Sequence, residues 1–366
     1  MRDLVFAITL VAYAGTSAAQ SLKDSFDSAS VDQSKWSTQQ VLPGQIDFVK
    51  PGRCGASAIE IVTREGDSGI MCDHDCQRAE LRAAGETWPA FGEEVWYAFS
   101  FRVDGDVPSS GSARSIIGQW KGPGDHSPMI AQRFDNGVFH ITVQDNDTRR
   151  VVAKAEGYPD RLVSAQNLLA KLDPHDERAV NAVKSLQSID LMAKTQPRLS
   201  RQLFKEKILS LFQHNQHSDE TETLSQTIGV ERAMISQFRA LSFVAEPEKY
   251  LGSADIEIVP EANRQLPDPR KGWVDMVYRI RPGRTDNEYG PHTKGELDIW
   301  ANGQKIVSVR GNLGATLKKG TPLSLVGPYF KFGTYRARVP GTFKFQFDEF
   351  SQARSKAGLA SLCPSH

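Results

Sequence analysis

The chain has 366 residues and a formal net charge of zero, because 44 Lys and Arg side chains balance 44 Asp and Glu side chains. This length is enough for one large β domain or about two domains of average size. The balanced charge excludes a global field that would attract nucleic acid or an anionic membrane, so a charged ligand would need a local patch.

Residues 1–19 are predicted to be a secretory signal peptide. An apolar run from Leu4 to Ala14 precedes three small residues, a pattern typical of cleavage before Gln20. A buried N-terminal helix is the alternative. No other segment approaches the roughly 18 consecutive apolar residues that a membrane span requires. We therefore expect a soluble protein that is secreted or periplasmic and has no membrane partner.

The four cysteines, Cys54, Cys72, Cys76 and Cys363, favour disulfides in an oxidising compartment. The stretch "CDHDC" also has spacing suited to a metal, with His74 as a third ligand. A zinc site would want a second ligand pair, and no obvious one exists. Disulfides are the better interpretation, and the spacing leaves their connectivity open.

Two strand-rich blocks are expected, at residues 20–149 and 251–366. In the first, "EVWYAFSFRVDG" and "GVFHITVQDND" alternate between apolar and polar residues. In the second, "GWVDMVYRIRPG", "GELDIWANGQKIVSVRG" and "GTFKFQFDEF" do the same, and Asn302-Gly303 predicts a hairpin turn. Many short antiparallel strands with aromatic alternation predict a mainly β fold, a β-sandwich or jelly roll with one curved sheet face open.

The segment at residues 150–250 has a different pattern. In stretches such as "DRLVSAQNLLAKL" and "RLSRQLFKEKILSLF", apolar residues recur at spacings of three and four. We expect an inserted α-helical segment within the β fold. It could contact the substrate or another protein.

Three predicted strands carry polar groups on the face opposite their apolar residues. They are the stretches "CQRAELRAA", "SIIGQWKG" and "YFKFGTYR". If these strands are neighbours, one sheet face collects cations, an amide and phenols, which suits an anionic polysaccharide. The polar positions in chain order are Arg78, Glu80, Arg82, Gln119, Lys121, Tyr329, Lys331 and Tyr335.

These stretches resemble the signatures of jelly-roll polysaccharide lyases, including alginate lyases, glucuronan lyases and heparin lyase of the first type. Those families carry an R-x-E-L strand, a Q-x-H-type strand and a Y-x-K-x-G-x-Y strand. Here "QRAEL", "IIGQWKG" and "YFKFGTYR" follow in the same order, and the resemblance covers both β blocks without the segment between them. It implies a concanavalin A-like β-sandwich and β-elimination at a uronic acid.

The resemblance also implies catalytic roles. Arg78 and Gln119 would neutralise the substrate carboxylate, so that negative charge can build up when the C5 proton leaves. Tyr335 would be the acid and also the base, with Lys331 beside it to favour the phenolate or hold the substrate. Glu80 would orient Arg78.

Further residues are expected to bind substrate or to shape the site. Gly333 is interpreted as room for a sugar ring between Lys331 and Tyr335. No cofactor and no catalytic metal are expected, although the acidic turns "DHD" and "DNDT" could hold a structural Ca²⁺. The expected substrate-binding residues are Lys121, Glu80, Tyr329, Arg82 and His126.

Lys121 stands where many relatives have a histidine. An imidazole there would be the separate base for elimination across opposite sides of the ring, whereas an ammonium is a poor base. In glucuronate and mannuronate the C5 proton and O4 lie on the same side, so one tyrosine can serve both steps. We expect syn elimination at these sugars, unless His74, His126 or His292 supplies an imidazole from a neighbouring loop.

Two other functions stay open. "GELDIW" resembles the E-x-D-x-x-E strand of retaining β-glucanases, but its third acidic position holds Ala301 or Asn302. A non-catalytic lectin-like protein is the second alternative. His140 alternates with polar residues on a strand face and is expected to be exposed.

Overall fold

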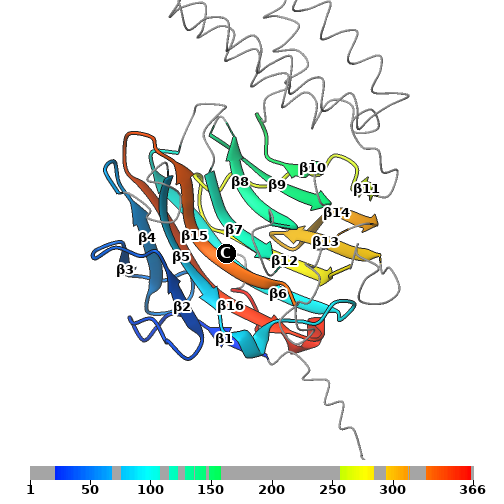
Figure 1. Ribbon diagram of the computed structural model, residues 1–366, viewed down its shortest axis with the longest axis horizontal. Coiled ribbons are helices and arrows are strands. Elements are labelled where there is room, and N and C mark those ends of the chain that lie inside the picture. Colours follow the sequence, from blue (N-terminus) through cyan, green and yellow to red (C-terminus); the bar gives the residue numbers. More distant parts are fainter. Residues whose placement is uncertain are drawn as a thin grey trace, which may run out of the picture.

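The computed structural model describes residues 21–67, 76–107, 115–122, 128–135, 137–145, 148–157, 256–283, 294–311, 313 and 327–363. Within these ranges the named strands pair antiparallel and form two sheets that pack face to face (Figure 1). The predicted mainly β sandwich is confirmed. The two short helical turns in the same ranges are η2 (Gly85–Thr87) and η5 (Lys356–Gly358).

The larger sheet has nine strands. Its order is β11 (Ile256–Pro260), β14 (Gln304–Gly311), β13 (Gly295–Ala301), β12 (Val274–Arg281), β6 (Val95–Gly105), β16 (Phe343–Ala353), β4 (Ala58–Thr63) and β3 (Ile46–Val49), and β1 (Leu22–Asp24) also pairs with β16.

The smaller sheet has seven strands. Its order is β10 (Thr148–Lys154), β9 (Val138–Asp145), β8 (Ile130–Asp135), β7 (Ser115–Lys121), β15 (Tyr329–Ala337), β5 (Cys76–Ala83) and β2 (Trp36–Gln39).

An aromatic core lies between the two sheets. Phe332 of β15 stacks on Phe347 of β16 with ring centroids 3.9 Å apart, and Trp36 of β2 meets Phe350 of β16 at 5.0 Å. Burial of each such side chain stabilises the fold by about 2 kcal/mol. Because Phe330 and Phe332 point inward, the residues that alternate with them on β15 face away from the core.

The predicted hairpin after "GELDIWA" is confirmed. Ala301 pairs with Gln304, and Asn302 and Gly303 both have positive φ, at 48° and 75°. These are the angles that a two-residue turn of the primed type requires. The Asn302 side chain also accepts a hydrogen bond from the backbone N–H of Asp275.

The first β block extends slightly past its expected limit at residue 149. Strand β10 continues to Lys154, because Val152 and Ala153 join the core. Residues 158–255, which include most of the predicted helical insertion, lie outside the described residues, as do the predicted signal peptide and the turn at residues 73–75.

A disulfide joins Cys54 to Cys363, two residues 309 positions apart in the chain. Cys76 is also disulfide-bonded, so it is not the thiolate metal ligand considered for "CDHDC". The disulfide prediction is confirmed for these residues. No helix in the described part of the chain is long and apolar enough to cross a membrane.

Candidate active site

The three motif strands are neighbours. Strand β15 lies between β5 and β7 near the middle of the smaller sheet (Figure 1). The register places Tyr335 opposite Arg78, and Lys331 opposite Arg82 on one side and Gln119 on the other. Residues directly opposite each other share a sheet face, so the predicted polar face is assembled as expected.

Glu80 is the centre of this face. Its Oε2 accepts a hydrogen bond from Arg78 Nε at 2.5 Å and lies 3.4 Å from Lys331 Nζ, while its Oε1 accepts a hydrogen bond from Gln119 Nε2. Only 1% of Glu80 is exposed. A single buried carboxylate therefore gathers three donors from three adjacent strands, which is more than the expected contact with Arg78 alone.

Tyr335 lies beside these donors. The guanidinium carbon of Arg78 is 5.0 Å from the centroid of the Tyr335 ring, a cation–π distance. The tyrosine is half-buried, whereas Phe330 and Phe332 on the same strand are fully buried. The phenol is thus outside the hydrophobic core, and the cation next to its ring is Arg78.

Lys331 is a buried ammonium, 3% exposed. Its pKa is lowered from 10.5 to about 8, mainly by burial and also by the nearby charges of Arg78 and Lys121, while Glu80 opposes this shift. Below about pH 8 the protonated form of Lys331 is favoured, so at neutral pH the site carries a buried ammonium. Because the surroundings are poorly solvated, the electrostatic field of this ammonium is weakly screened.

A second cluster occupies the other end of β15. The ring of Tyr329 lies 4.9 Å from that of Trp88, and the guanidinium of Arg82 is 5.6 Å from Tyr329 and 5.7 Å from Trp88. Arg82 Nε also donates to Ser37 Oγ on β2. The expected binding residues Tyr329 and Arg82 are therefore together. Trp88 was not predicted from the sequence as a binding residue. The signal that could have identified it was an indole side chain in the loop directly after β5.

Gly333 is required for a different reason from the one expected. Its φ is +132°, and an added Cβ would lie 2.3 Å from the carbonyl oxygen of Ala79 and 2.8 Å from Cα of Glu80. Both atoms are backbone atoms of β5. The glycine therefore permits close approach of β5 at an irregular position of β15, rather than leaving room for a sugar ring.

Two polar residues of the same face were not predicted as part of it. Ile116, opposite Tyr335, pairs on its other side with Arg133 of β8, and Arg133 lies opposite His140 of β9. Arg133 Nε donates to Thr142 Oγ1 at 3.0 Å. The expectation that His140 is exposed is wrong, because only 5% of it is accessible. It lies on an internal strand between β8 and β10, and alternation alone does not reveal such covering.

Of the remaining predicted binding residues, Lys121 is described by the structure and His126 is not. Lys121 is opposite Tyr329 on the same face and is half-buried. His126 lies outside the described residues, as do the other two loop histidines considered as bases, His74 and His292.

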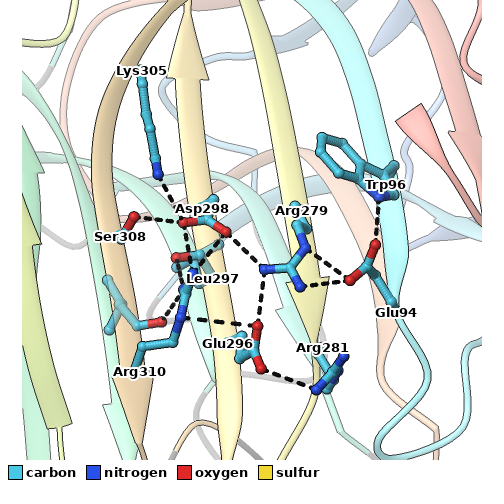
Figure 2. Close-up of polar contacts among 11 residues, drawn as sticks. Glu94, Trp96, Arg279, Arg281, Glu296, Leu297, Asp298, Lys305, Ser308 and Arg310 are labelled. Carbon is cyan, nitrogen blue, oxygen red and sulfur yellow. Dashed lines mark hydrogen bonds and ion pairs between the residues drawn. The ribbon is translucent and has the colours of Figure 1, made fainter. Parts of the chain in front are cut away.

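The "GELDIW" strand, β13, belongs to the other sheet. Glu296 and Asp298 point away from the core and into a network with Arg279, which also binds Glu94 (Figure 2). Burial would raise the pKa of Asp298, but hydrogen bonds from Ser308, Arg279 and Arg310 hold it at about 2. Asp298 is therefore ionised at neutral pH and does not serve as a general acid. The third acidic position of the glucanase motif is held by Ala301 or Asn302.

Three comparisons with known proteins bear on this geometry. A family model described as "Polysaccharide lyase" matches residues 28–198 and 204–351. Among solved structures, alginate lyase A1-II', a member of polysaccharide lyase family 7, is 10% identical with a TM-score of 0.39, over 87% of this chain and 94% of that chain.

The cellulose-induced protein Cip1 is 12% identical with a TM-score of 0.41, over 93% of this chain and 100% of that chain. No curated protein matches. Structural likenesses this distant carry no argument about the reaction.

Proposed function

Because this chain belongs to the polysaccharide lyase family, we propose that it cleaves a uronic-acid polymer by β-elimination on the face formed by β5, β7 and β15. The convergence of Arg78, Gln119 and Lys331 around Glu80, next to Tyr335, is the observation that carries this proposal.

The donors match the first difficulty of the reaction. The C5 proton of a uronate is barely acidic while the neighbouring carboxylate is charged, so that charge must be neutralised before an enolate-like transition state can form. The guanidinium of Arg78 and the amide of Gln119 are the expected neutralisers. Lys121, Lys331 and Arg82 make the face cationic, which favours an anionic chain over a neutral one.

Tyr335 suits the proton transfers. It is half-buried, and its ring lies beside the guanidinium of Arg78 and outside the hydrophobic core. We propose that the phenolate takes the C5 proton and that the resulting phenol then protonates the departing O4. One group acting on one side of the ring corresponds to syn elimination, and thus to glucuronate or mannuronate.

The protein's surroundings are part of the same proposal. We propose that the chain is exported to the periplasm or secreted, a compartment that the Cys54–Cys363 disulfide favours. The chemistry above uses only side chains, so no catalytic cofactor is invoked. Calcium in an acidic turn would be structural, and the inserted segment predicted at residues 150–250 would contact substrate or a partner protein.

The test is an absorbance assay across defined polymers, because β-elimination creates an unsaturated uronate that absorbs in the near ultraviolet. Glucuronan and polymannuronate should give a rising signal, and polyguluronate should give little. Turnover confined to polyguluronate would overturn syn elimination by Tyr335. Binding of these polymers without any absorbance would instead favour the lectin-like alternative.

A further inference from the structure

We infer that Glu80 is a positioning residue of this lyase, whose buried carboxylate holds Arg78, Gln119 and Lys331 in the arrangement that receives the substrate carboxylate. The inference rests on the proposed function. The inference extends the proposed function, because Glu80 would act on the substrate only through these three side chains.

The contacts of Glu80 connect the three strands of the site. Its two oxygens serve donors from its own strand β5, from β7 and from β15. Both oxygens are thus engaged, and the side chain is 2% exposed. A carboxylate that is buried and engaged by three donors is not accessible to a sugar, so we do not assign it as the general base.

Electrostatics explain why a carboxylate is needed at this point. Lys331 lies among three charged groups of β5, an amide and an ammonium of β7, and one phenol of its own strand. These groups are Arg78, Glu80, Arg82, Gln119, Lys121 and Tyr329. Among them Glu80 is the one anion, and without it like charges would separate the side chains that must converge.

The same pairing has a consequence for the proton on Lys331. Glu80 raises the pKa of Lys331 against burial and against the charges of Arg78 and Lys121, which together leave it at about 8. If catalysis requires the ammonium, kcat/KM should fall above that pH. Removal of the Glu80 charge lowers the pKa further, so the alkaline fall should move to lower pH by about one pH unit or more.

The experiment compares the wild type with Glu80→Gln and Glu80→Asp, using pH profiles of kcat and KM on the polymer that the wild type cleaves. Glu80→Gln should lower kcat by about 10²-fold, the effect of an active-site displacement near 1 Å, and should shift the alkaline limb to lower pH. Glu80→Asp keeps the negative charge, so its alkaline fall in kcat/KM should return to the wild-type pH. Glu60→Gln is the matched control, because Glu60 is a buried carboxylate of β4 that binds Gln346 in the other sheet.

Two kinetic results would overturn the inference. One is a Glu80→Gln enzyme with unchanged activity, and the other is an equal loss of activity at every pH with no shift of the alkaline fall. A crystal structure of Glu80→Gln provides a readout without activity. Displaced Arg78, Gln119 and Lys331 side chains support the inference, and superimposable ones contradict it. If the wild type cleaves no uronate polymer, the proposed function fails, and this structure still decides whether Glu80 positions the cluster.

Discussion

Replacement of Gly333 by alanine should damage both stability and catalysis. The new Cβ would meet the carbonyl oxygen of Ala79 at 2.3 Å, where ordinary contact begins at 3.4 Å, so β5 and β15 must separate by about 1 Å. The φ of +132° adds backbone strain of about 1–3 kcal/mol. Because β5 carries Arg78 and Glu80, a displacement of this size should lower kcat/KM by about 10²-fold.

Urea unfolding and initial lyase rates measure the two effects. Gly303→Ala is the matched control, because Gly303 also has a positive φ but has no atom within 4 Å of the new Cβ and lies in the hairpin of the other sheet. It should lose about 1–2 kcal/mol and keep its activity. A Gly333→Ala enzyme with normal stability, normal kcat and a raised KM would refute this reasoning and restore the interpretation that the glycine makes room for a sugar.

Three further outcomes concern features other than the motif strands. Arg279→Met should lower the free energy of unfolding by about 2–3 kcal/mol, since three partly buried carboxylates lose their shared guanidinium. Arg270→Met, which breaks an exposed pair, should lower it by less than about 1 kcal/mol. Equal losses for the two variants would contradict a stabilising role of the Arg279 network. Paired serine substitutions at Cys54 and Cys363 should cost about 2–5 kcal/mol in the same assay, and no loss would show that the bridge does not constrain the unfolded chain. EDTA should leave kcat of the folded enzyme unchanged. If a purely structural calcium ion is bound, its removal by EDTA should lower only the Tm.

Local alternation was enough to assign the faces of the site strands. Leu81, Trp120 and Phe332 are large apolar residues that must be buried, so their polar neighbours in the sequence had to face outward. Alternation does not specify which strands pair. Adjacency of β5, β7 and β15 came from the order of motifs shared with known lyases, and the register then brought their polar residues together.

Features that depend on three-dimensional packing were not predictable in this way. The three donors around Glu80 come from residues up to 251 positions apart, and the reason for Gly333 lies in the backbone of another strand. His140 has the sequence context of an exposed residue but is buried. "GELDIW" has the spacing of a catalytic strand, and only the topology places it in the opposite sheet.

The central claim is tested most directly by replacing one hydroxyl group. Tyr335→Phe keeps the ring against Arg78 and removes the proposed proton carrier, so near-ultraviolet product formation should fall by about 10²–10⁴-fold while calorimetric binding of the same polymer stays near the wild-type value. Tyr329→Phe, which keeps its ring against Trp88, should retain most of the rate. A Tyr335→Phe enzyme as active as Tyr329→Phe would contradict proton transfer by Tyr335.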